Sequence, residues 1–219
     1  MNKLVKRVGL LLLLGLPFSA LAGEDLGAGI KAIQKEWAQI KYRAPKSEKA
    51  EKLKMLAGKA ENLASRFPKS AEPLIWQAIS LGTYAGAVGG LDSLFESLPA
   101  VKKAKVALEK AVELNPEALN GAGVSTLGSF YYQVPGWPIA YGDKDKAREF
   151  LEKGLSLNPN GVDSNYFYGD FLFEQGEYKK AAEVLKKALD APARQGRALA
   201  DEGRKEEVSE KLKEVKAKL

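Results

Sequence analysis

The feature that most constrains this sequence is a pattern of small and large apolar residues that occurs three times. In two segments, Ala104 to Pro116 and Ala147 to Pro159, leucine lies four positions after the alanine, a second small residue seven positions after it, and proline twelve positions after it. A third segment, Ala181 to Pro192, begins 34 residues after the second and has its proline one position earlier. Residues spaced by four and seven share one stripe of a helix, where small side chains let a neighbouring helix approach closely. The pattern therefore predicts repeated helix pairs.

The other helix of each pair carries its own small contact residue. Leu127-Gly128 and Tyr168-Gly169 provide it in the two later pairs. Between Gly128 and Ala147 the chain has seven residues more than between Gly169 and Ala181, which places an insertion within residues 133–143. An earlier pair is expected at residues 70–85 and 98–114, with a longer insertion around Gly89-Gly90.

The fold class expected from these patterns is all-α, with a single helical-repeat domain at residues 23–219. The best repeat covers residues 162–192, and degenerate repeats cover 71–116 and 117–159. Ahead of them, residues 25–43 and 47–66 form a further helical pair. Residues 194–219 have the position of a capping region, with a helix from about residue 204.

The first 22 residues have the layout of a secretory signal peptide. Lys3, Lys6 and Arg7 precede an apolar run at residues 8–16, and Ala20-Leu21-Ala22 forms a small-residue cleavage site. We expect cleavage after Ala22 and a periplasmic protein. The apolar run is too short to span a membrane, and no cysteine follows it. Neither a stable membrane anchor nor lipidation is expected.

Composition excludes several kinds of chemistry. The chain has no cysteine and no histidine, which leaves out thiol nucleophiles, imidazole catalysis and the usual zinc and copper ligands. No catalytic motif, cofactor fingerprint or metal site is expected. The signal segment holds three cations and no acid, so the formal charge falls from +6 to +3 once it is removed. Lysine and glutamate alternate along the remainder, which does not favour nucleic-acid binding.

The unit beginning at Val162 resembles the tetratricopeptide-repeat family. The match rests on matching residues at the family's fixed offsets: Tyr168, Gly169, Leu172, Gly176, Tyr178, Ala181, Leu185 and Ala188. It departs at the first aromatic position, where Asn165 stands. The resemblance implies a right-handed superhelix of stacked antiparallel helix pairs with inserted loops. It also implies a non-enzymatic scaffold whose concave groove binds a protein or an extended peptide.

The resemblance places candidate binding residues on the first helices and on the inserted loop. We expect the inserted segments to close the groove in part. Trp137 has two interpretations, because its ring either covers an apolar seam between repeats or belongs to an aromatic wall of the site. The candidate binding residues are Tyr131, Tyr132, Trp137, Tyr141, Tyr166, Asp170 and Phe173.

An alternative function follows from the inserted loop itself. Val134-Pro-Gly-Trp-Pro138, followed by Gly142-Asp143 and a repeat helix, is similar to the T component of tripartite (TRAP) solute transport systems. That resemblance implies an accessory protein that binds a small ligand in an occluded groove. The sequence lacks the lipidated cysteine common in that family.

Overall fold

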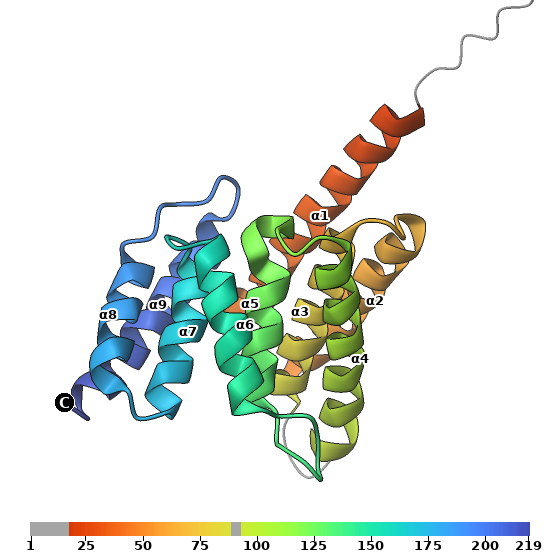
Figure 1. Cartoon of the computed structure of the whole chain (residues 1–219). Helices are drawn as coiled ribbons and strands as arrows, with labels where there is room; N and C mark the ends of the chain where they lie inside the picture. Colours follow the sequence, from red (N-terminus) through yellow and green to blue (C-terminus); the bar gives the residue numbers. More distant parts are fainter. Residues whose placement is uncertain (1–17, 89–92) are drawn as a thin grey trace, which may run out of the picture.

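The computed structural model describes residues 18–88 and 93–219 (Figure 1). Within these residues the chain forms nine α-helices and no β-strand. The helices are α1 (Phe18–Arg43), α2 (Lys46–Arg66), α3 (Ala71–Ala87), α4 (Ser93–Leu114), α5 (Ala118–Gln133), α6 (Lys144–Leu157), α7 (Val162–Glu174), α8 (Tyr178–Leu189) and α9 (Ala198–Lys216). Consecutive helices pack against each other and run in opposite directions (Figure 1), which confirms the all-α class of stacked helix pairs.

The apolar stripe of the repeat lies where the sequence predicts it. Its small residues and leucines on α4, α6 and α8 are all buried. A methyl group built on Gly128 would lie 2.8 Å from the Leu151 side chain, and one on Gly169 would lie 2.6 Å from Leu185. The two glycines therefore allow the close helix approach that the pattern requires.

This packing yields a first prediction. Ala181 is fully buried in the cluster formed by α7, α8 and α9. Replacement of Ala181 by leucine is expected to lower the free energy of unfolding by about 1–3 kcal/mol, the usual cost of overpacking. Lys187→Ala, an exposed change on the same helix, serves as the control, and chemical denaturation measures both. Equal effects would show that the two helix faces are assigned wrongly.

Three boundaries differ from expectation or leave a prediction open. Helix α1 begins at Phe18 and continues through Ala22, while residues 1–17 lie outside the described part, so signal cleavage stays a prediction. Residues 89–92 of the earlier insertion also lie outside it. Helix α9 begins at Ala198 and not near residue 204. The charged residues of its first turns suggested a solvent-exposed loop. In the structure Asp201 is buried and paired with Arg194, which stabilises this part of the helix.

The inner helices form a closed ring. Each of α1, α3, α5 and α7 contacts the next odd-numbered helix, and α9 contacts both α7 and α1. The junction of α1 with α9 is held by an ion pair between Lys41 and Glu207 at 2.8 Å and one between Arg43 and Glu202 at 3.1 Å. Between them Gly203 lies directly against the Tyr42 ring. The first and last described helices therefore meet. None of the described helices is long and apolar enough to cross a membrane.

Candidate functional site

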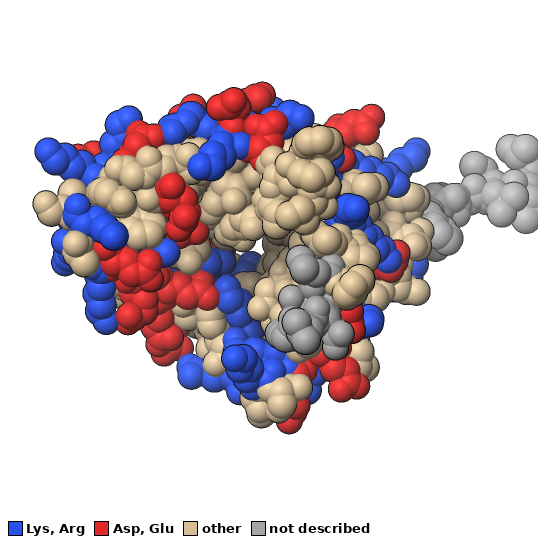
Figure 2. Space-filling view, turned by 90° about the horizontal axis from the view of Figure 1, so that it is seen from below, with Lys and Arg blue, Asp and Glu red and all other residues tan. Residues whose placement is uncertain are grey.

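A central cavity of about 1060 Å³ lies inside the ring of inner helices. Its wall combines residues of all five odd-numbered helices with the start of α2 and the segment between α8 and α9. Figure 2 shows this hollow at the centre of one face, with Lys and Arg atoms gathered on one side of it. The ring of helices around the cavity is completed by the packing of α9 against α1. The loop at residues 134–143 contributes no lining residue.

The charge of the cavity wall is unbalanced. Among the residues that the structure describes, two acidic ones line it, Asp163 and Glu207. Six basic residues of the same described part line it as well: Lys41, Lys46, Lys49, Arg194, Arg197 and Arg204. Since a cleft lined by an excess of one sign of charge concentrates the field within it, the described part of the wall favours anions.

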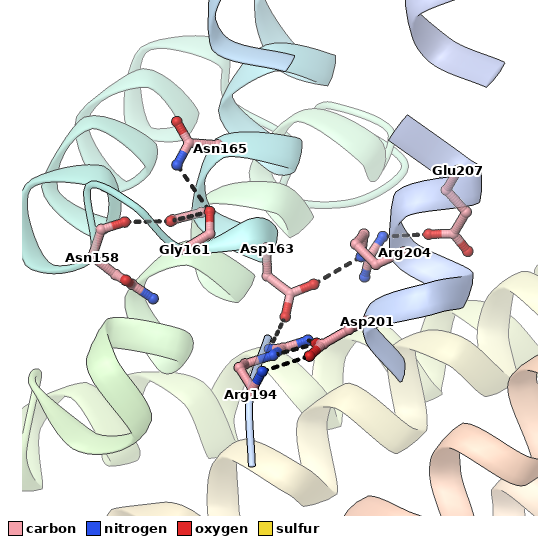
Figure 3. A network of polar contacts seen from close by, with 9 residues as sticks. Asn158, Gly161, Asp163, Asn165, Arg194, Asp201, Arg204 and Glu207 are labelled. Atoms are coloured by element: carbon pink, nitrogen blue, oxygen red, sulfur yellow. Dashed lines mark hydrogen bonds and ion pairs between the residues drawn. The ribbon is translucent and has the colours of Figure 1, made fainter. Parts of the chain in front are cut away.

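Asp163 lies at the centre of an ion-pair network on this wall (Figure 3). Its carboxylate accepts from Arg204 Nε at 2.8 Å and from Arg194 Nη1 at 2.7 Å. Arg194 also pairs with Asp201 at 2.6 Å, and Arg204 with Glu207 at 2.5 Å. The network joins the start of α7 to α9 and to the segment before α9.

The network fixes the charge state of its members. Burial alone would raise the pKa of Asp163, but Arg204 and Arg194 outweigh this effect and hold that pKa well below its usual range. The same pairing raises the pKa of Arg204 despite its burial. Burial and the nearby Arg204 lower the pKa of Lys41 to about 8, although Glu207 opposes the shift. The Asp163 carboxylate is therefore ionised at neutral pH.

Local hydrogen bonds position Asp163 at the start of α7. The fully buried Asn165 donates through Nδ2 to the carbonyls of Pro159 at 2.9 Å and Gly161 at 2.8 Å (Figure 3). Ser164 Oγ donates to the Asn158 carbonyl at 2.5 Å. Asparagine at a position where the family has an aromatic residue thus ties the preceding turn to the helix.

Trp37, Tyr42 and Trp76 line the cavity close to its cations. The Trp37 ring meets the edge of Trp76 at 5.7 Å and that of Tyr42 at 5.8 Å between ring centroids. Trp37 Nε1 donates to Thr83 Oγ1 at 3.0 Å. The guanidinium of Arg197 lies 5.1 Å from the centroid of the Trp76 ring. This wall offers apolar surface beside a cation.

Several buried polar atoms of the cavity wall have no hydrogen-bond partner within the described chain. They are Tyr42 Oη, Trp76 Nε1 and Arg197 Nε. The indole and the guanidinium only donate hydrogen bonds. Buried polar groups are nearly always satisfied in proteins, so three at one cavity indicate a place for an acceptor-rich group.

Backbone strain also occurs on this wall. Leu119 and Asn120 have φ of 52° and 56°, and both line the cavity. A left-handed conformation costs a residue with a side chain about 1–2 kcal/mol. Such positions are held by their surroundings and cluster at functional sites.

The structure separates the residues that the sequence predicts for the site. Tyr166 lines the cavity, with the Arg204 guanidinium 4.4 Å from its ring centroid. Tyr132 donates to Asp170 at 2.6 Å, and Asp170 also pairs with Lys211 at 3.2 Å. This contact lies between α5, α7 and α9, outside the cavity lining.

The remaining predicted residues lie further from the cavity. Phe173 packs on Tyr178 beneath α9. Tyr131 is buried and stacks on Phe150 at 5.7 Å. Tyr141 meets the edge of Tyr131 and donates to the Val101 carbonyl at 2.9 Å, which fastens the loop to α4. Their role in binding stays a prediction.

Trp137 lies at the exposed part of the loop. Its side chain is 90% exposed, and Ile139 beside it is 55% exposed. The ring therefore covers no apolar seam within the described chain. Whether Trp137 contacts a partner stays a prediction.

Sequence reasoning missed the residues that supply the unpartnered donors. Tyr42, Trp76 and Arg197 come from three segments far apart in the chain, and none belongs to the best repeat at residues 162–192. The sequence held one weak indication of this part of the site. Trp37 and Trp76 are two of the three tryptophans, and both lie on the first helices of pairs.

The described residues were compared with metal-site chemistry and with known proteins. They contain no cluster of three or more acidic side chains able to hold a metal ion. Comparison with curated proteins gives no match to the chain. A family model described as tetratricopeptide repeat matches residues 139–215, from the end of the inserted loop through most of α9. Domains of this family are typically non-catalytic and generally bind protein partners. The part of the chain that forms α6 to α9 is thus similar to the tetratricopeptide repeat.

Proposed function

We propose that the protein is an exported, non-catalytic interaction scaffold that holds a segment of a protein partner in the central cavity. The observation that carries this proposal is the cavity itself, which the inner helices of a tetratricopeptide-type array surround and which opens on one face of the molecule (Figure 2). Its volume of about 1060 Å³ lies at the upper end of the range for ligand pockets. A short extended segment suits this size.

The titratable groups of the cavity favour binding over catalysis. General acid–base catalysis needs a group whose pKa lies near the working pH. Asp163 and Glu207 are both tied to arginines, and the pKa of Asp163 lies far below neutrality. Lys41 has a pKa of about 8, but its ammonium group is paired with Glu207 at 2.8 Å. The paired carboxylates and arginines provide a charge pattern suited to recognition.

The proposed periplasmic location rests on the sequence. The basic residues, apolar run and Ala-Leu-Ala site within residues 3–22 support export. We expect the partner to be an exported protein or the periplasmic part of a membrane protein.

A pair of glycine substitutions tests whether a partner enters the cavity. Gly86 lines the cavity near the end of α3, and a Cβ built there meets nothing within 4 Å. Gly86→Trp is expected to occupy part of the cavity and to weaken partner binding by about tenfold or more. Gly58→Trp is the matched control, because Gly58 is also helical and unobstructed but lies outside the cavity.

The partner for this test is found by photo-crosslinking. A photoreactive residue at Gln133, an exposed residue at the cavity wall, should capture a discrete exported protein. That protein is then titrated against the wild type and the two variants. Equal affinity of all three would place the partner on another surface and refute the proposal.

A further inference from the structure

We propose that the central cavity anchors its occupant through a carboxylate group bound by Arg197 beside Trp76. The occupant's neighbouring apolar group then lies against Trp37 and Trp76. This inference rests on the proposed function, in which a partner segment enters the cavity, and it names the chemistry that the segment must present.

The first support is the difference between Arg197 and the arginines around it. Arg194 and Arg204 each pair with two carboxylates. Arg197 makes no side-chain hydrogen bond or ion pair within residues 18–88 and 93–219, and its Nε is buried. Burial and the nearby Arg194 lower its pKa. A half-buried guanidinium that remains charged is stabilised by an acceptor of opposite charge.

The second support is the local charge balance. Four cations, Lys41, Arg194, Arg197 and Arg204, surround three acids, Asp163, Asp201 and Glu207. This cluster of seven described residues has one positive charge in excess, and Lys46 and Lys49, which also line the cavity, are not part of it. A single carboxylate neutralises that excess. A dianionic phosphate would bring a second negative charge near Asp163 and Asp201, which opposes its binding.

The third support is the set of donors around Arg197. Trp76 Nε1 and Tyr42 Oη are buried without partners in the described chain, and both line the cavity. A carboxylate accepts hydrogen bonds at about four lone-pair sites, so one such group can accept from more than one donor. The faces of Trp37 and Trp76, whose rings meet at 5.7 Å, provide apolar surface beside it.

Binding of simple carboxylates tests the chemistry without knowledge of the partner. The probe is 3-phenylpropionate, which joins one carboxylate to an apolar ring, and the readout is the indole N–H resonances of the ¹⁵N-labelled protein. The chain has three tryptophans, and Trp137 lies outside the cavity. We expect millimolar probe to shift the Trp76 resonance and leave that of Trp137 in place. The neutral amide of the probe should bind about tenfold more weakly or worse.

Variants assign the effect to Arg197. Arg197→Gln is expected to weaken probe binding by about tenfold or more. Arg197→Lys keeps the charge but loses the fork geometry, and should retain part of the affinity. Lys187→Gln removes an exposed charge on α8 and should change nothing. Thermal melts of each variant confirm that it is folded.

Other outcomes overturn the inference. Equal binding of acid and amide, unchanged affinity of Arg197→Gln, tighter binding of inorganic phosphate, or an unmoved Trp76 resonance would each do so. Three further probes identify the source of the carboxylate by their affinities. They are a peptide with a free C terminus, the same peptide with an amidated C terminus and an internal aspartate, and the small acid alone. The probe that binds most tightly indicates whether the carboxylate is a chain terminus, a side chain or a free acid.

The affinity of the crosslinked partner for two variants distinguishes failure of this inference from failure of the proposed function. If the crosslinked partner binds wild type and Arg197→Gln equally but loses affinity for Gly86→Trp, the cavity holds the partner without a carboxylate anchor. If Gly86→Trp also binds normally, the proposed function itself is wrong.

Discussion

Replacement of Asp163 by asparagine is expected to lower the free energy of unfolding by about 3 kcal/mol. The change leaves Arg204, whose side chain is only 7% exposed, without its central acceptor and removes one of the two acids bound by Arg194. Breaking a buried ion pair on one side commonly costs about 3–5 kcal/mol. The lower end applies because the Asp163 side chain is itself one-third exposed (34%) and asparagine still accepts one hydrogen bond.

The pH dependence of the free energy of unfolding tests whether Asp163 acts through its charge. The pKa of Asp163 in the folded state lies below the ordinary aspartate value of about 3.8, because Arg204 and Arg194 stabilise the ionised carboxylate. Its ion pairs therefore stabilise the fold above about pH 4 and lose that effect as the pH falls below it. Chemical denaturation at neutral and acidic pH should show the variant's deficit shrinking in acid. The control Glu183→Gln changes an exposed acid on α8. A deficit that stays constant with pH would show that Asp163 does not act through its charge.

Replacement of Gly203 by leucine is expected to separate α9 from α1 and to open the ring. A Cβ at this position would lie 2.4 Å from ring atoms of Tyr42, so the two helices must move apart. Overpacking of this kind costs about 1–3 kcal/mol. Opening the ring also displaces Tyr42 from the cavity wall, so binding of the carboxylate probe should fall with it.

A distance measurement detects the opening directly. Because the chain has no cysteine, spin labels can be attached at Gln39→Cys on α1 and Glu206→Cys on α9, which are both exposed. The label distance should lengthen and broaden in Gly203→Leu and stay unchanged in the control Gly58→Leu, where a Cβ meets nothing within 4 Å. An unchanged distance in Gly203→Leu would show that the junction tolerates the larger side chain.

The helix pairs were predictable because their cause is local. Ala181, Leu185 and Ala188 lie within two turns of one helix, and their spacing alone defines a buried stripe. Residues 198–203 were harder to assign to a helix. Their charges suggest solvent exposure, but Asp201 is paired with Arg194 at the ring junction.

The site was less predictable because its cause is not local. The central cavity depends on the return of α9 to α1, which results from small rotations accumulated over all the helix pairs. No pattern in the sequence links Trp76 on α3 to Arg197 before α9, although the two side chains lie in contact. Tyr166 was predicted because its place in the repeat determines which side of α7 it occupies.

The meeting of the two ends has a consequence for how the molecule unfolds. In an open array each unit depends only on its neighbours, so terminal units fray independently. Here Arg43 and Glu202, 159 residues apart, are in direct contact. Contacts of such long sequence separation slow folding, because the chain must close a large loop before gaining them. They also link the first helix to the last, so amide protons of α1 and α9 should exchange with solvent in the same opening event, and deletion of α9 should expose α1 as well.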